Sequence, residues 1–281
     1  PATPQDFEQQ ACTTAAINSK DADPANDGTG GWIISTDYHA MYTWLSAYNR
    51  DMISGSITPA QSPYRFATDE TRQALRFLRE LYDQRCAWLA QYEYPEIEFA
   101  SRQGLFSVGS LLDIPYQAQV FAAAEYQDEW TVIPFPSPQG KPLITVYGPS
   151  YIMLPSSPER QLAAWVFLKW LSQPQQQSRL VQASGGFPLR QSTLAELSAY
   201  RKQNPQWAAA IDLLPLAQPE PALQSWSVVR WTLSDAGTQL FRSYFTIDQV
   251  TSLANYLDLT ASELHQGLPL PTPTQLASLT K

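Results

Sequence analysis

Aromatic side chains recur along this sequence beside carboxylates, on segments that read as loops or first helical turns. A polyhydroxylated ligand such as a sugar offers a flat C–H face and a rim of hydroxyls. Its binding site therefore needs aromatic faces for stacking and planar polar groups for paired hydrogen bonds. Loops are where such sites usually lie. The candidate ligand-binding residues are Asp37, Tyr38, Tyr42, Trp44, Asp113, Tyr116, Tyr147, Gly148, Arg190, Glu220 and Trp226.

Several of these residues keep a second interpretation. Gly148 has no Cβ and could let a ligand approach the backbone, or it could only serve a tight turn before Pro149. Tyr38, Tyr42 and Leu45 share one face of a helix, so the tyrosines could instead pack under a loop. Both interpretations stay open at this point.

Motifs of reaction chemistry were sought and not found. The sequence holds no G-x-G-x-x-G, no P-loop, no G-x-S-x-G and no H-E-x-x-H. The two histidines, His39 and His265, lie far apart and read as surface or packing residues, which excludes a histidine metal site. The 26 acidic residues leave room for a carboxylate pair, so a carbohydrate-active hydrolase remains the alternative. We predict a binding protein, not an enzyme, with no cofactor and no metal.

Composition excludes other classes of protein. The 281 residues are 44% hydrophobic without a long apolar run, so no membrane-spanning segment is expected. The net charge is −8, and 18 Lys and Arg lie scattered among the acids, which excludes nucleic acid as a partner. Cys12 and Cys86 lack metal-ligand spacing and either pair or remain two buried thiols.

The stretch Thr131–Arg190 is the centre of the predicted fold. Ser157 followed by a proline predicts a helix start, and Leu162, Val166 and Trp170 give that helix an apolar face. A second helix is expected from Pro174 to a left-handed cap at Gly185. Before these helices the sequence predicts short strands at Thr131–Pro136, Ile144–Tyr147 and Tyr151–Leu154, with a turn at Gln139-Gly140.

Capping signals place further helices on both sides of this stretch. Thr3-Pro4 with Asp6, and Thr68 with two acids after it, predict helix starts. A buried strand is expected at 32–34, and a helix from Trp226 to about 244 tolerates Gly237. Thr246 and Gln249 predict a capping box for a final helix.

The order of these segments carries a family resemblance. A proline-rich strand and turn (133–140), Tyr147-Gly148-Pro149-Ser150, a strand end (152–156), an Ala164–Leu171 helix and a closing Gly186–Arg190 follow one another. This set resembles the family 1 extracellular solute-binding proteins, the maltose- and oligosaccharide-binding receptors of ABC importers. The sequence departs from the family pattern at Pro4, Arg102 and Leu111-Leu112, where relatives carry Trp, Gly and an aromatic residue.

The resemblance implies an α/β fold of the type II periplasmic binding proteins, with two lobes and hinge crossovers. It implies that the opening part of lobe I is absent, so the first lobe is incomplete. The expected segments are 1–138 (first part of lobe II), 139–187 (partial lobe I with hinge strands), 188–267 (closing helices, mainly lobe II) and 268–281 (Pro-rich tail).

The resemblance also implies the function and its partners. We expect an extracytoplasmic receptor that binds a mono- or oligosaccharide or a polyol between its lobes and delivers it to ABC permease subunits. The candidate loops are not basic, which favours a neutral ligand over a phosphate ester. Tethering through a removed N-terminal lipid anchor fits this class. The helix that carries Trp165 and Trp170 would lack its partner, so we expect either a second chain there or exposed structure.

Overall fold

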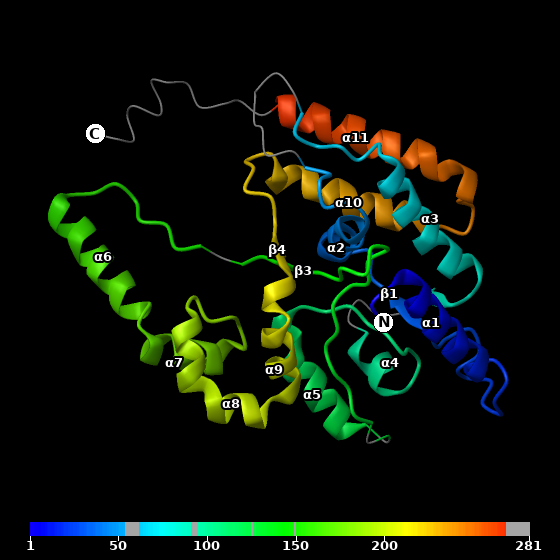
Figure 1. The fold of residues 1–281 in the computed structure, drawn as a ribbon, viewed down its shortest axis with the longest axis horizontal. Coiled ribbons are helices and arrows are strands. Elements are labelled where there is room, and N and C mark those ends of the chain that lie inside the picture. The colour runs from blue at the N-terminus through cyan, green and yellow to red at the C-terminus, as the bar shows by residue number, and fades with distance from the viewer. Residues whose placement is uncertain (54–61, 91–94, 125, 127, 149, 268–281) are drawn as a thin grey trace.

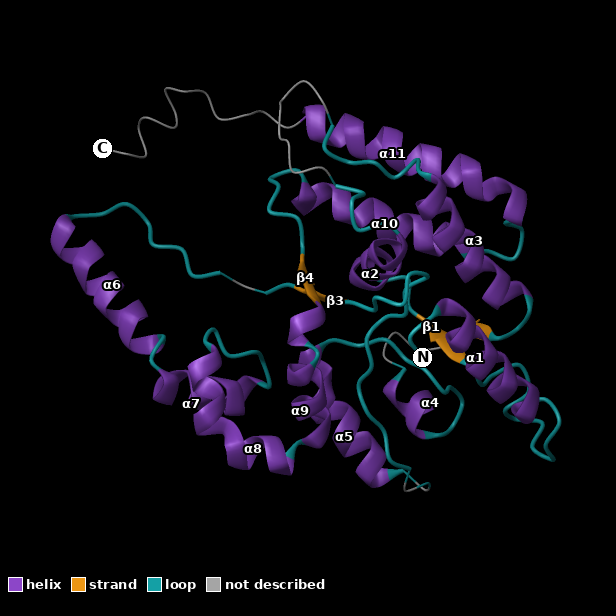
Figure 2. Ribbon diagram, in the orientation of Figure 1, coloured by secondary structure: helices purple, strands orange, loops and turns teal. Residues whose placement is uncertain are grey.

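Helices make up most of the fold, and the strands are few and short (Figures 1 and 2). Within the described residues the strands form two separate two-stranded parallel pairs, β1 with β2 and β3 with β4. The computed structural model describes residues 1–53, 62–90, 95–124, 126, 128–148 and 150–267.

The largest packed unit, here called the main group, combines the first helices of the chain with the last two. Helix α2 lies against both α3 and α10, and α10 lies against α11. A Cβ built on Gly237 of α10 would lie 3.0 Å from Met41 of α2, so a residue without a side chain lets these helices approach closely. The elements of this group are α1 (Pro4–Asn18), β1 (Trp32–Ile34), α2 (Tyr38–Tyr48), α3 (Asp69–Asp83), β2 (Ala87–Leu89), α10 (Trp226–Leu240), η4 (Ile247–Gln249) and α11 (Val250–Gly267).

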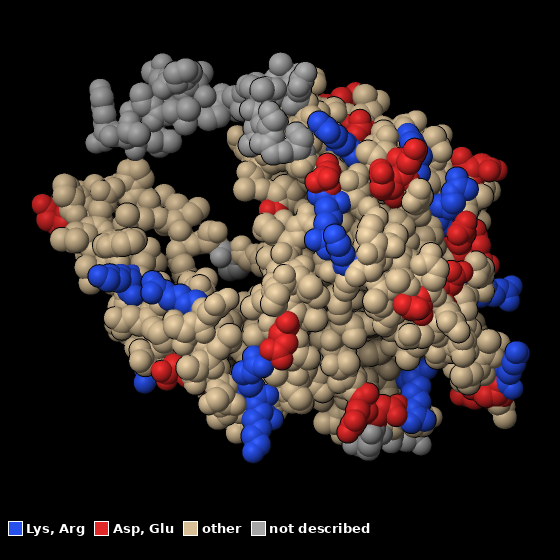
Figure 3. Space-filling model, in the orientation of Figure 1, with Lys and Arg blue, Asp and Glu red and all other residues tan. Residues whose placement is uncertain are grey.

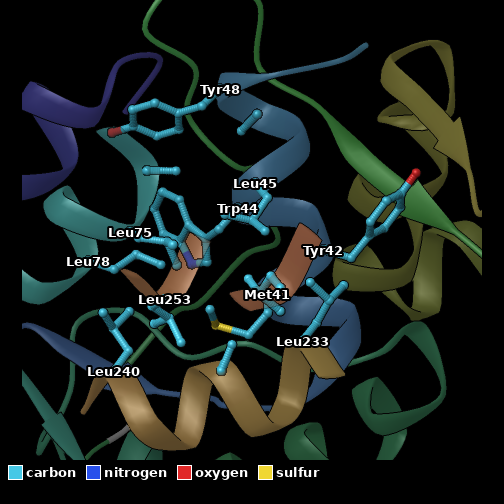
Figure 4. Packing of buried hydrophobic residues seen from close by; sticks show 14 of the residues in the cluster. Met41, Tyr42, Trp44, Leu45, Tyr48, Leu75, Leu78, Leu233, Leu240 and Leu253 are labelled. Atoms are coloured by element: carbon cyan, nitrogen blue, oxygen red, sulfur yellow. The ribbon is translucent and has the colours of Figure 1, made fainter. Parts of the chain in front are cut away.

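The core of the main group is continuous and rich in aromatic rings. Trp32 and Trp44 meet edge to face with ring centroids 5.6 Å apart, and the Phe7 ring contacts both. Figure 4 shows the buried side chains of α2, α3, α10 and α11 around Met41 and Leu45. Burial of these apolar side chains is the main stabilising term of this group.

A disulfide joins Cys12 of α1 to Cys86, the residue before β2. The sequence leaves open whether these cysteines pair or remain two buried thiols, and the structure shows that they pair. Strand β2 runs parallel to β1, with Trp32 opposite Ala87. The bond therefore fixes the first helix to the edge of a strand pair inside the main group.

A second group of helices packs around a smaller core. Ile114 from the first half of the chain lies there with Val181 and Trp207 from the second half. The predicted boundaries at 138 and 187 stay predictions; in this structure side chains from both sides of them share one core. The predicted tail 268–281 lies outside the described residues. The elements of the second group are α4 (Glu96–Ala100), η1 (Leu111–Asp113), α5 (Ile114–Ala123), α7 (Pro174–Ser184), η2 (Gln191–Leu197), α8 (Ser198–Gln203), α9 (Pro205–Asp212) and η3 (Leu214–Leu216).

The pair β3 (Ile144–Val146) and β4 (Ala217–Pro219) lies between the two groups (Figure 1). The predicted strand at Ile144–Tyr147 is present as β3, but the strand predicted at Tyr151–Leu154 is wrong. Tyr151–Leu154 forms no strand, and its side chains are exposed. The predicted strand at Thr131–Pro136 makes only one bridge, Phe135 with Leu143, because its prolines have no N–H to donate.

Helix α6 (Pro158–Leu171) projects away from the rest of the molecule, with its best contacts to α7 (Figure 1). None of its residues is buried, and Trp165 and Trp170 are 56% and 46% exposed. These two tryptophans are therefore exposed in this chain, as expected from the sequence when no second chain is present. Few charges cover this part of the face seen in Figure 3, whereas both signs are mixed over the main group.

Most predicted helix boundaries are confirmed. Thr3 and Asp6 form the predicted capping box, and Thr68 accepts a hydrogen bond from the backbone N–H of Thr71. Helix α7 ends at Gly185, which has the left-handed φ of 73° expected for such a cap. At Ser157 the helix starts as predicted but the side chain makes no capping hydrogen bond.

Candidate functional site

Three rings from two distant segments form a stack, here called the ring stack (Tyr38, His39 and Tyr147). The Tyr38 and His39 rings are 3.8 Å apart and tilted by 33°. The His39 and Tyr147 rings are 3.6 Å apart and nearly parallel, at 21°. The stack joins the start of α2 to the residue that follows β3.

The backbone places these rings through the N-terminus of α2 and the ends of two strands. Asp37 is the N-cap of α2, and its carboxylate accepts a hydrogen bond from the backbone N–H of His39 at 2.8 Å. Thr43 and Thr145 share a hydroxyl–hydroxyl hydrogen bond of 2.6 Å, which holds β3 against α2. The Glu220 N–H donates to the Val146 carbonyl at 3.1 Å and so brings that carboxylate to the same place.

Both nitrogens of His39 face carboxylates. Nδ1 lies 2.8 Å from Asp37 Oδ1, and Nε2 lies 3.5 Å from Glu220 Oε1. The second contact lacks hydrogen-bond geometry, and both of its atoms are buried without a hydrogen-bond partner in the described part of the chain. Most buried polar atoms in folded proteins have a hydrogen-bond partner.

Helix α10 closes the inner end of the stack. The Arg230 guanidinium lies over the Tyr38 ring at 4.8 Å, and Trp231 meets the same ring edge to face at 4.9 Å. Arginine held against aromatic faces gains from the ring quadrupole. Tyr38 is therefore enclosed, and Tyr147 is the outer ring of the stack.

The electrostatic environment of the stack is acidic. Burial, followed by the negative charges of Asp37 and Asp113, raises the pKa of Tyr147 to about 12. Burial also raises the pKa of Tyr38. Burial disfavours the charged form of Asp37, but its hydrogen bonds to His39 outweigh that effect and hold its pKa below the usual value. Neutral tyrosines beside ionised carboxylates offer hydroxyl donors together with strong acceptors.

The site thus presents one partly exposed aromatic face with hydrogen-bonding groups at its edges. Tyr147 is 46% exposed, so a flat apolar surface could stack on it. The carboxylates of Asp37 and Glu220 are positioned to accept hydrogen bonds. In the described ranges no three His, Cys, Asp or Glu side chains gather as a metal site would require.

The structure brings together part of the predicted residue set. Asp37, Tyr38, Tyr147 and Glu220 meet at the ring stack, and the charge of Asp113 reaches it. Tyr42 and Trp226 lie beneath, in contact with each other at 5.0 Å but both buried.

Trp44, Tyr116 and Arg190 lie apart from the stack, whereas Gly148 follows Tyr147 directly in the chain. Trp44 is 1% exposed and enclosed by core rings, on the other side of α2 from Tyr42 (Figure 4). Tyr116 is exposed on α5, and Arg190 is exposed before η2, both in the second group. A Cβ at Gly148 would meet no atom within 4 Å, so nothing in the described chain requires a glycine there.

Sequence reasoning missed His39, Arg230 and Trp231. His39 reads as an isolated histidine, because its partners Tyr147 and Glu220 lie more than a hundred residues away in the sequence. The only local signal is the acidic N-cap two residues before it, whose carboxylate contacts the imidazole.

A surface hollow of about 450 Å³ lies elsewhere, between Phe121, Trp130 and Gln206. Two of its three polar side chains, Asp128 and Gln206, already have partners. Arg102 pairs with Asp128 at 2.6 and 2.7 Å, and the Gln206 amide donates to the Trp130 carbonyl at 3.2 Å. We therefore place the candidate site at the ring stack and not at this hollow.

Solved structures share the fold of this chain. Sugar-binding protein MalE from Xanthomonas citri superimposes with a TM-score of 0.75 at 20% identity, over 94% of this chain and 64% of that one. The cyclic alpha-maltosyl-1,6-maltose binding protein of Arthrobacter globiformis gives 0.73 at 16% identity, over 95% and 65%. A cyclo/maltodextrin-binding protein complexed with maltotetraose gives 0.69 at 15%, over 96% and 66%. The chain thus spans slightly less than two thirds of the length of these neighbours, and at these identities the likeness shows the fold alone.

The fold is therefore that of the periplasmic sugar-binding proteins of the MalE type, which confirms the predicted α/β type II class. Residues 1–213 match the family described as bacterial extracellular solute-binding protein, and the chain belongs to that family. No curated protein matches the chain in sequence.

Membership confirms two predictions. The family and its structural neighbours are binding proteins and not enzymes, which removes the hydrolase alternative. The family is extracellular, as the predicted extracytoplasmic location requires. No helix in the described part of the chain is long and apolar enough to cross a membrane.

Proposed function

We propose that this chain is the substrate-binding component of an ABC importer and that it binds a carbohydrate or polyol at the ring stack. The observation that carries the proposal is the outer ring, Tyr147, which is partly exposed and stacks on His39, whose two nitrogens face the carboxylates of Asp37 and Glu220. A sugar ring would stack on Tyr147 and donate hydroxyl hydrogen bonds to the two carboxylates.

The surroundings support a neutral ligand over an anionic one. Arg230 is the cation nearest to the stack among its described contacts, and its guanidinium already lies over Tyr38 and Trp231. A phosphate ester would need a free cluster of Arg or Lys. Two of the structural neighbours are described as bound to maltotetraose and to alpha-D-tagatose, which supports the sugar class.

Delivery to permease subunits is the second part of the proposal. An importer of this class needs a receptor held near the membrane, and a lipid anchor at a processed N-terminus would provide that tether. Measurement of sugar uptake in cells with and without the receptor tests this part directly.

A third part concerns the α6 arm, defined as Tyr151–Leu171. Its side chains Ile152, Trp165 and Trp170 are exposed at 81%, 56% and 46%, far more apolar surface than a monomer usually leaves uncovered. We propose that a folded polypeptide outside these 281 residues, supplied by another chain, covers this face and completes the first lobe.

The binding experiment is calorimetry with maltose, maltotriose, glucose and sorbitol. We expect at least one of the sugars to bind, and Tyr147→Ala to weaken that binding at least tenfold. Tyr256→Ala is the matched control, because Tyr256 is an exposed tyrosine on α11, away from the stack. The proposal fails if none of the four compounds binds at millimolar concentration, or if both variants bind alike.

The arm experiment follows tryptophan fluorescence. In the isolated chain Trp165 and Trp170 should emit at long wavelength and be quenched by acrylamide. The difference between the wild-type spectrum and that of a Trp165→Phe/Trp170→Phe variant gives the fluorescence of these two residues. Protein purified from its source should show this signal shifted to shorter wavelength and protected. Equal quenching in both preparations would rule out a covering polypeptide.

A further inference from the structure

His39 occupies the middle of the ring stack, with both ring faces covered and both nitrogens facing carboxylates. Tyr38 covers one face and Tyr147 the other, at 3.8 and 3.6 Å between centroids. Its Nδ1 and Nε2 edges face Asp37 and Glu220 at 2.8 and 3.5 Å. The imidazole therefore has no free face on which a ligand could stack.

Tyr147 depends on His39 for its orientation. It follows the last residue of β3, outside any helix or strand, and its ring contacts no other aromatic ring within the described residues. The Tyr38 side of the stack is held by Arg230 and Trp231 of α10. His39 thus connects a fixed ring to a ring that its own backbone does not fix.

We infer that His39 is a positioning residue, which holds the Tyr147 ring parallel to the Tyr38–His39 pair so that its outer face is presented for binding. The ligand part of this inference rests on the proposed function. The orientation part concerns the protein alone and can be tested without any ligand.

Ring shape and polar edges make separable contributions to this role. His39→Phe keeps a flat ring between the tyrosines but loses the contacts to Asp37 and Glu220. His39→Gln keeps polar atoms and loses the ring, and His39→Ala loses both. Stacked aromatic pairs are worth about 2- to 10-fold in an equilibrium, so we expect Phe to preserve the orientation of Tyr147 better than Gln or Ala.

The first experiment is NMR of ring-labelled tyrosine in the protein without ligand, with the Tyr147 signal assigned through Tyr147→Phe. Removal of the imidazole also removes its ring current, so the readout is the mobility of the Tyr147 ring and not its chemical shift. We expect the Tyr147 signal to sharpen to the width of a mobile side chain in His39→Ala and to keep the width of a held ring in His39→Phe. An unchanged width in His39→Ala would overturn the inference. Circular dichroism of each variant shows whether it folds, and if His39→Ala does not, His39→Gln takes its place.

The second experiment is a double-mutant cycle with maltotriose as the probe. If His39 acts through Tyr147, His39→Ala should weaken binding about fivefold in the wild-type background and have no effect in Tyr147→Ala. An equal loss in both backgrounds would mean that His39 acts on the site by another route, and the inference would fail.

The two experiments separate the inference from the proposed function. A Tyr147 ring that becomes mobile without His39, in a protein that binds none of the sugars tested, would support the positioning role and count against carbohydrate binding. Sugar binding at Tyr147 with no dependence on His39 would do the reverse.

Discussion

Helices α3 and α6 have the same kind of apolar pattern, but the apolar side chains of α3 are buried and those of α6 are exposed. In α3, Leu75 and Leu78 at helical spacing are fully buried. In α6, Leu162 and Val166 at the same kind of spacing are 64% and 56% exposed. An amphipathic pattern therefore predicts that one face of a helix packs against other apolar residues. It does not predict which residues these are, or whether they belong to the same chain.

Loss of the disulfide should have the largest effect, and only the main group has such a bond. In the Cys12→Ala/Cys86→Ala variant the loop of 74 residues is no longer closed, and unfolding should become easier by about 4 kcal/mol. Urea unfolding followed by circular dichroism measures this. A change below about 1 kcal/mol would show that the main group does not depend on its covalent link.

A matched pair of leucines tests the comparison of the helices directly. Leu78→Ala removes a fully buried side chain from α3 and should lower the free energy of unfolding by about 3 kcal/mol. Leu162→Ala removes an exposed side chain from α6 and should change it by less than about 0.5 kcal/mol. Equal losses for the two variants would show that α6 is packed in solution and that the contrast is wrong.

The smallest effect concerns the ring stack at high pH. The folded-state pKa of Tyr147, about 12, lies above the ordinary value of 10.0, so the folded protein binds this proton more tightly than the unfolded chain. The resulting stability is present below pH 10.0 and is lost as pH rises through about 12. Tyr147→Phe should therefore reduce the alkaline loss of stability in that window. Its absorbance titration should lack one phenol that ionises near pH 12, and loss of a phenol that ionises near pH 10.0 would contradict the placement of Tyr147.

Local signals in the sequence predict much of this fold. Capping at Thr3, Thr68 and Thr246, and the glycine at the end of α7, place helix ends because those interactions span only a few residues. The partner of β3 could not be predicted in this way. Strand pairing depends on contacts across a long excursion of the chain, and β4 contains a proline that argues against a strand.

The site shows the same limit. Residue type and expected loop position predicted Asp37, Tyr38, Tyr147 and Glu220, which the structure brings together, but gave equal weight to Trp44, which is a core residue. A residue of α2 lies at the stack or in the core according to the side of the helix that it occupies, and that depends on where α3 and α10 pack. His39 was missed because its role comes from residues far away in the sequence.

The parallel pair β3–β4 imposes an order on folding. Ile144 pairs with Ala217, so the strand stays without its partner until the entire chain between them has returned. Closing so long a loop is entropically costly, and contacts between distant residues slow folding. Tyr147 and Glu220 follow directly on these strands, so we expect their contacts to His39 to form late in folding, together with this strand pair.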